Sequence, residues 1–345
     1  MTTVADGLFQ YGGMLVFGGV PPFVGASSKT FFVDPVNGAD GNDGQSPKRA
    51  FATLYRAHYQ MTSGNNDVCY FIGNGAATGA ETLSLANALA AQGPSETAAT
   101  TGMLTWSKDA CHLIGIAAPT QMFQRCKVIQ SQTAAIFNSS TMVTFSGNGN
   151  YIANMFFSNE SAAGAAADVT VAVSGLRNCF NNVHFGFPSG TAAIADSGSR
   201  ALVITGQEDT FLNCAFGFDT VTRSTTNATV EFLAGAARAI FRNGLFNVIS
   251  SSAGAFHVLG TGDGCLQKFA LFDDCIFMDN SYAGGTALTV VSSFTTANPG
   301  GALIFSHSQC VSASTAEWGD ANAKLQSRVD NVGGAGTAGI MLRPT

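Results

Sequence analysis

A short phrase that recurs at a fixed spacing constrains this chain more than any other feature of its sequence. The phrase has the form Phe-x-(Asn/Asp)-x-x-Phe, and its copies begin 31, 30 and 31 residues apart, at Phe180, Phe211, Phe241 and Phe272. Weaker copies extend the series to residues 152–157 and 305–310. A period of this length indicates a repeat architecture, in which each repeat packs only on its neighbours.

Each repeat predicts three β-strands. An alternating apolar run such as Val169, Val171 and Val173 precedes the phrase, and a period of two places these side chains on one face of a strand. A second strand leads into the first Phe, and a third follows the Asn. Because the inward positions change parity at the Asn, the chain must bend there, and Asn and Asp tolerate the left-handed backbone of a tight corner.

Stacked repeats place these corner residues above one another. We interpret the column as structural, because side-chain amides at a corner can hydrogen-bond along the stack, while the Phe residues fill the interior. The sequence therefore predicts an all-β fold, a parallel β-helix of about six to seven coils over residues 110–312, each coil adding roughly 4.8 Å. The predicted corner ladder consists of Asn154, Asn182, Asn213, Asn243 and Asp274.

The segments that flank the coils predict caps. Within residues 31–109, Ser46 is a candidate helix N-cap with Pro47 at the first helical position. A helix from there to Met61 would cover the unpaired strand edges of the first coil, and a lateral excursion follows over residues 74–102. Residues 313–345 predict a C-terminal cap or tail, with a short helix over residues 316–329.

Residues 1–30 form an apolar, Gly-rich arm. No residue between Asp6 and Lys29 is charged, but the glycines and prolines of this stretch would interrupt a membrane helix. We favour a docking arm on a sister subunit or a particle; a strand or loop folded back on this chain and a membrane segment are the alternatives. The apolar docking residues are Leu8, Phe9, Tyr11, Met14, Leu15, Phe17 and Phe23.

A cluster of Asp, Asn and Gly residues follows the first predicted strand. The carboxylates of Asp34, Asp40 and Asp43 offer the hard oxygen ligands that calcium prefers. Their spacing is not that of an EF-hand loop, so we favour an Asx-rich turn and predict no metal site.

The coil phrase resembles the Ile-x-Asn-x-x-Phe coils of right-handed parallel β-helix proteins of the pectin-lyase-like superfamily. Residues 31–47, followed by 50–54, resemble the N-terminal segment of many phage and bacterial members. The resemblance implies a right-handed β-helix over most of residues 30–312. It leaves function open, because the superfamily includes polysaccharide lyases, phage tailspikes and non-enzymatic virion proteins.

The search for catalytic groups yields one weak candidate pair, Glu208 and Asp209, just before one copy of the phrase. Aligned repeats place Arg177, Glu208 and Arg238 in one column. Such a column could serve catalysis through carboxylates, but stacked surface turns also use it to neutralise one another. We favour the structural interpretation and predict no catalytic residue and no cofactor.

Composition narrows the class of partner. Charged residues make up 11% of the chain, against roughly 25% in ordinary soluble proteins, which favours a surface held against other proteins. The net charge of −6 argues against nucleic-acid binding, which usually shows a basic stripe.

We therefore expect a non-enzymatic virion structural protein of a tailed bacteriophage, foremost a capsid decoration or cement protein attached through its N-terminal arm. Its expected partners are copies of itself, in a trimer, and the major capsid protein or another virion protein, with no nucleic acid and no membrane. Its expected location is the virion, after assembly in the cytoplasm of the host bacterium. The alternative is a tailspike-like protein that binds or depolymerises polysaccharide; a secreted pectate-lyase-like enzyme is disfavoured because no signal peptide is evident.

Overall fold

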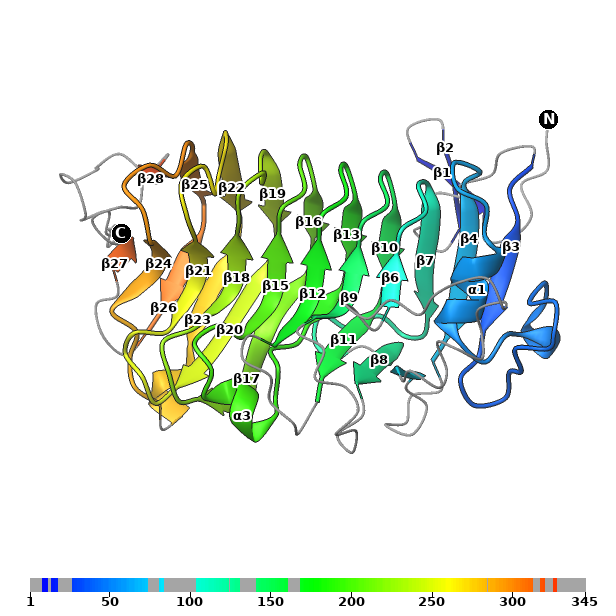
Figure 1. The fold of residues 1–345 in the computed structure, drawn as a ribbon, viewed down its shortest axis with the longest axis horizontal. Coiled ribbons are helices and arrows are strands. Elements are labelled where there is room, and N and C mark those ends of the chain that lie inside the picture. The colour runs from blue at the N-terminus through cyan, green and yellow to red at the C-terminus, as the bar shows by residue number, and fades with distance from the viewer. Residues whose placement is uncertain are drawn as a thin grey trace.

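The computed structural model describes residues 8–11, 14–17, 27–73, 81–83, 104–123, 125–130, 141–160, 168–283, 285–312, 317–319 and 325–327. Within them the chain winds into an elongated parallel β-helix (Figure 1), and successive strands join three long parallel sheets in turn. The predicted all-β parallel β-helix is confirmed.

The strands divide among three sheets, which we call sheets I, II and III. Sheet I contains β3 (Thr30–Val33), β4 (Asp67–Ile72), β7 (Cys111–Ile116), β10 (Tyr151–Ala153), β13 (Cys179–Asn181), β16 (Thr210–Leu212), β19 (Ala239–Arg242), β22 (Phe269–Asp273), β25 (Ala302–Ser306) and β28 (Leu325–Ser327). Sheet II contains β5 (Glu81–Leu83), β8 (Lys127–Gln130), β11 (Phe156–Asn159), β14 (His184–Phe185), β17 (Ala215–Arg223), β20 (Leu245–Ser250), β23 (Ile276–Asp279) and β26 (Gln309–Val311). Sheet III contains β6 (Leu104–Trp106), β9 (Thr141–Phe145), β12 (Val169–Val173), β15 (Arg200–Ile204), β18 (Ala228–Phe232), β21 (Phe256–Gly260), β24 (Val290–Phe294) and β27 (Glu317–Gly319).

The coil is the sequence repeat. Strands of sheet I pair so that Phe180 aligns with Phe211, Phe211 with Phe241, and Phe241 with Phe272. In the described part of the chain, complete triples of strands run from β4–β5–β6 to β25–β26–β27. The triple that begins at β4 precedes residue 110, so the coils extend beyond the predicted range of 110–312.

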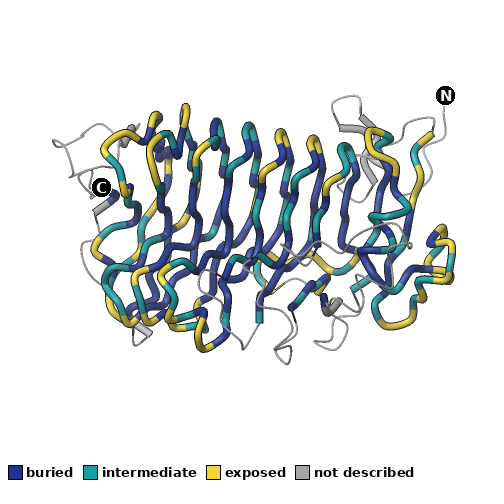
Figure 2. Tube along the Cα trace, in the orientation of Figure 1, coloured by how far each residue is buried: buried dark blue, intermediate teal, exposed yellow. Residues whose placement is uncertain are grey.

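Two columns of stacked Phe rings fill the interior. Ring centroids lie 5.0, 4.6, 4.7 and 5.1 Å apart along the column Phe180, Phe211, Phe241, Phe272 and Phe305. In the second column they lie 5.2, 4.5 and 4.5 Å apart along Phe185, Phe216, Phe246 and Phe277. The two columns meet edge to face, which suits the quadrupoles of the rings. Figure 2 shows buried residues along the strands and exposed residues at many of the turns.

The N-terminal capping helix is shorter than predicted. A 3-10 turn, η1 (Pro47–Arg49), follows Ser46, whose side chain makes no capping hydrogen bond. The helix α1 (Leu54–Gln60) begins later and is capped by Thr53. The reason is tertiary: the Phe51 N–H donates to Phe32 of β3, and the Phe51 carbonyl accepts from Asp34, directly after β3. The backbone is therefore extended between the two helical pieces. Leu54, Tyr55 and Ala57 of α1 still pack into the core.

The C-terminal residues also differ from the prediction. The short helix expected over residues 316–329 is replaced by β27 and β28, which pair with β24 and β25. Trp318 explains the difference, because its buried ring lies 4.6 Å from Phe305 and 5.7 Å from Phe277 and so extends the aromatic core. The coil pattern thus continues past Ser312, within the segment that the sequence assigned to a cap or tail.

The N-terminal arm contains a β-hairpin, β1 (Leu8–Tyr11) and β2 (Met14–Phe17), with Leu8 opposite Phe17. The hairpin is a separate two-stranded sheet. Two short helical elements, α3 (Thr191–Ile194) and η3 (Asn280–Ala283), lie in connections from sheet II to sheet III. Among the described residues, no helix combines the length and hydropathy of a membrane span.

Candidate functional site

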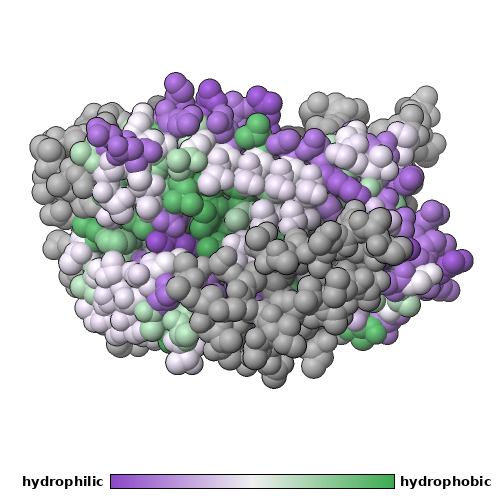
Figure 3. Space-filling model, in the orientation of Figure 1, coloured by the Kyte–Doolittle hydropathy of each residue, from purple (hydrophilic) through white to green (hydrophobic). Residues whose placement is uncertain are grey.

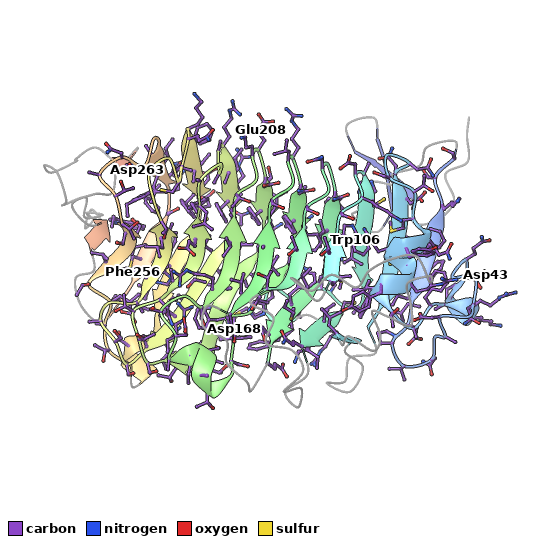
Figure 4. All side chains as sticks on the ribbon, viewed as in Figure 1. Asp43, Trp106, Asp168, Glu208, Phe256 and Asp263 are labelled. Carbon is purple, nitrogen blue, oxygen red and sulfur yellow. The ribbon has the colours of Figure 1, made fainter. Side chains whose placement is uncertain are left out.

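The turns that lead from sheet III into sheet I hold the charged column that the sequence singled out. Arg177 Nε lies 2.6 Å from Glu208 Oε2, and Arg238 Nη1 lies 2.8 Å from Glu208 Oε1. Figure 4 places Glu208 on these turns, at the upper edge of the view, and Figure 3 shows hydrophilic side chains gathered along the same edge. Both carboxylate oxygens of Glu208 therefore bind a guanidinium from a neighbouring coil.

Asp209 faces the opposite way from Glu208. Its side chain is fully buried, and its Oδ1 accepts a hydrogen bond of 2.8 Å from the Asn178 N–H. Burial raises the pKa of Asp209 to about 7, although the hydrogen bond from the Asn178 backbone N–H acts in the other direction. A carboxyl group sealed in this way cannot touch a substrate, so the two candidate acids do not form a catalytic pair.

Asp209 instead ends a buried polar ladder that sequence reasoning missed. Asn150 Oδ1 accepts from the Cys111 N–H at 2.7 Å, and Asn178 Oδ1 accepts from the Asn150 N–H at 2.9 Å. Each member satisfies a buried backbone donor of the preceding coil. The signal was present in the sequence. Three successive copies of the phrase have an Asn or Asp two residues before their first position, at Asn150, Asn178 and Asp209.

A glycine stands three residues ahead of each ladder member, where the backbones of adjacent coils come close together. A Cβ added to Gly175 would lie 2.0 Å from the Gly147 carbonyl oxygen, and one added to Gly206 would lie 2.0 Å from the Gly175 carbonyl oxygen. The Gly206 Cβ would also lie 2.5 Å from Asp209 Oδ2. Adjacent coils are too close at this turn for any side chain.

The corner residues between sheets I and II adopt the left-handed conformation. Asn182 Nδ2 donates to Asn154 Oδ1 at 3.0 Å, and Asn243 Nδ2 donates to Asn213 Oδ1 at 3.1 Å. Asn213 Nδ2 donates to the neighbouring Asn181 at 3.2 Å. The φ angles lie between +52° and +55° at Asn154, Asn182, Asn213, Asn243 and Asp274.

A cluster of ionisable side chains lies at the C-terminal end of this column. His307 occupies the corner position after Asp274, and ligand atoms of Asp273, Asp274 and His307 all lie within 4.8 Å of one another. A hydrogen bond from Ser306 is the main cause of the lowered pKa of Asp273, and His307 and Arg242 also contribute. These donor types could hold a divalent cation. Sequence reasoning missed the cluster, although a His in the corner position of the weak last copy was a visible signal.

The three weak calcium candidates are engaged in their own turns. Asp34 accepts from the Val36 and Asn37 N–H groups, and although burial alone would raise its pKa, these bonds lower it. Asp40 accepts from the backbone and hydroxyl of Thr53. Asp43 lies 3.1 Å from Arg49 and far from Glu208 (Figure 4). The structure does not bring the three carboxylates together as one set of metal ligands.

The predicted docking residues fall on the hairpin. Leu8, Phe9 and Tyr11 belong to β1, and Met14, Leu15 and Phe17 belong to β2. Phe23 lies outside the described residues.

Comparison with known proteins identifies the fold. No protein-family model matches the chain, and no curated protein sequence matches it significantly. Among solved structures, the pectate lyase Pel9A is similar with a TM-score of 0.53 and 12% identity, over 82% of this chain and 63% of that one. A pectin methylesterase variant in complex with a hexasaccharide is similar with a TM-score of 0.50 and 12% identity, over 90% and 92% of the two chains.

These likenesses define the class of structure: a parallel β-helix of the kind found in this pectate lyase and this pectin methylesterase. At such low sequence identity they show the fold alone. The chain spans less than two thirds of the length of the pectate lyase.

Proposed function

We propose that the chain is a non-enzymatic structural protein of a tailed-bacteriophage particle, and that it decorates or cements the capsid through its N-terminal arm. The observation that carries the proposal is the β1–β2 hairpin. Its strands pair with each other and, among the described strands, with no strand of sheets I to III. Since a lone two-stranded hairpin is marginal in water, an uncharged hairpin of this kind gains its stability by docking.

The state of the candidate acids supports a structural role. Glu208 is neutralised by two arginines and Asp209 is buried. A glycosidase needs two accessible carboxyl groups at a defined separation, and this pair does not provide them. The low charge content adds to the argument, because a surface of small uncharged side chains suits contact with neighbouring proteins.

The partners we propose are two further copies of the chain, in a trimer, and the major capsid protein or another virion protein. A rod with one arm at its N-terminal end suits copies that stand together on a shared base. The proposed location is accordingly the virion.

The first test is the copy number of this chain in purified virus particles, measured by quantitative protein staining against the major capsid protein. A ratio near that of the capsid protein, or a simple fraction of it, is the expected result. A ratio that corresponds to a few copies per particle would contradict the decoration role. It would indicate a protein of the tail instead.

The second test addresses the arm. A variant of residues 29–345 should keep its β-sheet circular dichroism but lose co-sedimentation with particles that lack the native protein. Leu15→Ser combined with Phe17→Ser should weaken co-sedimentation, whereas Gln10→Ser in the same hairpin is the matched control. Unfolding of the 29–345 variant would instead make the arm part of the core.

The second candidate function is a tailspike-like protein that binds or depolymerises polysaccharide. It is favoured by the proteins that share this fold, a pectate lyase and a pectin methylesterase in complex with a hexasaccharide. The cluster of Asp273, Asp274 and His307 is the surface group that suits it best. Release of sugar fragments from host capsule, lost in Asp273→Ala and retained in Glu208→Ala, would support this function over the structural one.

A further inference from the structure

The corner at which sheets II and III meet is polar, in contrast to the Phe-filled interior beside it. Buried side-chain atoms near the ends of its strands have no hydrogen-bond partner within the described residues: Thr170 Oγ1, Ser199 Oγ, Arg223 Nη1, Asn227 Oδ1 and both ring nitrogens of His257. Because buried polar groups are nearly always paired, the groups of this set that lie nearest one another, on Arg223 and His257, call for a further hydrogen-bond partner.

Arg223, the last residue of β17, dominates the corner. Its side chain is among the largest that are fully buried, with a relative exposure of 1%. The guanidinium carbon lies 3.9 Å from the centroid of the Phe187 ring, and Nη2 donates to Thr229 Oγ1 at 2.8 Å. Burial lowers the pKa of Arg223 to about 9, so the group still carries its positive charge at neutral pH.

His257 lies beside Thr229 on the next strand of sheet III. The pairs Ala228 with Phe256 and Val230 with Val258 bracket this position. Its ring is fully buried and lies 5.4 Å from Phe277. Burial, and the nearby charge of Arg223, lower the pKa of His257 to about 3. The imidazole is therefore neutral and keeps one N–H that can donate.

The charge of Arg223 is not balanced by its surroundings. Arg223 forms no ion pair with any carboxylate among the described residues. The nearby Arg200 forms an ion pair with Glu231 at 3.0 Å. The charge of this carboxylate is therefore balanced by Arg200 and not by Arg223. Asp168, which directly precedes β12, is buried at the same corner, and its backbone carbonyl accepts from the Arg200 N–H. Its side chain forms no ion pair with Arg223. A buried cation without a counter-charge is costly, and the π face of Phe187 offsets only a part of this cost.

We propose that Arg223 and His257 bind a small monovalent inorganic anion inside this corner. In the cell this anion would be chloride. The anion would accept from Arg223 Nη1 and from the imidazole N–H, and it would balance the single uncompensated charge. A multivalent oxyanion is disfavoured because the corner offers one free positive charge and no exposure to solvent. A water molecule could accept the same hydrogen bonds but would leave the charge of Arg223 uncompensated. Bound water is therefore the outcome that competes with a bound anion.

Bromide substitution tests the proposal directly. The full chain is refolded and crystallised in sodium bromide without chloride, and anomalous scattering is measured at the bromine edge. A peak next to Arg223 Nη1 is the expected result, whereas a position refined as water with no anomalous signal would overturn the proposal. Refolding in bromide avoids slow exchange into a buried site.

Thermal unfolding gives an independent measurement. Chloride should raise Tm by about 2–4 °C relative to gluconate at equal ionic strength, because an ion that binds only the folded chain stabilises it. Arg223→Met should abolish this difference, and Arg177→Met, which changes a side chain that is 72% exposed, should leave it unchanged. Equal Tm values of the wild-type chain in the two salts would also refute the site, and this comparison holds even if Arg223→Met does not fold.

Discussion

Replacing Asp209 by Asn should stabilise the protein, and the gain should grow with pH. The carboxyl group has a pKa of about 7 in the folded chain, against 3.8 for an ordinary Asp. Because the folded state holds its proton more tightly than the unfolded state, the wild type loses stability as pH rises from about 4 to about 7. Above pH 7 the loss is complete.

The magnitude follows from the shift. Each pKa unit corresponds to about 1.4 kcal/mol, so ionised Asp209 destabilises the fold by up to about 4 kcal/mol. Asn keeps the acceptor for the Asn178 N–H and removes the charge. Its amide N–H group would be unpaired, as it is in Asn150 and Asn178, which costs roughly 1–3 kcal/mol. We therefore expect a net gain of about 1–3 kcal/mol at pH 8.

The assay is equilibrium unfolding in urea at pH 5, 6, 7 and 8, with refolding checked at each pH. The difference between Asp209→Asn and wild type should increase from pH 5 to pH 7 and level off by pH 8. Asp219→Asn, which changes an exposed Asp in β17, is the matched control and should show no such trend. A difference that does not change with pH, or one that favours the wild type at pH 8, would refute the assignment of a buried, proton-binding Asp209.

Three further substitutions test the packing of the coils. Gly175→Ala should destabilise strongly or prevent folding, because its Cβ would lie 2.0 Å from a carbonyl oxygen, whereas Gly41→Ala has open space and should be neutral when urea midpoints are compared. Phe241→Ala, in the middle of a Phe column, should cost about 3–5 kcal/mol, while Val311→Ala, at a side chain that is 42% exposed, should cost less than about 1 kcal/mol in the same urea assay. Glu208→Gln should cost only about 0–1 kcal/mol and less at high salt; a loss of several kcal/mol would show that the charged column is a major source of stability.

The repeat made the fold predictable from sequence. The change of parity at Asn182 and its equivalents predicted a corner, and the structure has a φ of +54° there. The spacing of Phe180 and Phe211 predicted their stacking, because residues one period apart must occupy the same position in adjacent coils. The same alignment brought Arg177 beside Glu208. In each case one period of sequence corresponds to one step along the axis.

Features that depend on contacts outside the repeat were not predictable in this way. Phe51 and Leu54 have helical spacing, but pairing of Phe51 with β3 overrides the helix. Glu208 and Asp209 are neighbours in sequence, yet only the stacked coils show that one faces solvent and the other the interior. Arg223 showed no pattern at all, since it ends a strand whose register shifts between Gly217 and Thr222.

Stacking also constrains where chemistry can reside on such a surface. Equivalent positions of adjacent coils lie about 4.8 Å apart, so like charges in one column would repel one another. The described columns avoid this conflict: Arg177, Glu208 and Arg238 alternate in sign, and Asp209 lies between the neutral Asn178 and the position of Ala239. Two catalytic carboxylates are then easier to accommodate on neighbouring residues of one coil than on equivalent positions of adjacent coils. Asp273 and Asp274 are neighbours of this kind. Substitution of Asp273, rather than of Glu208, is therefore the test that distinguishes a polysaccharide-processing enzyme from a structural protein.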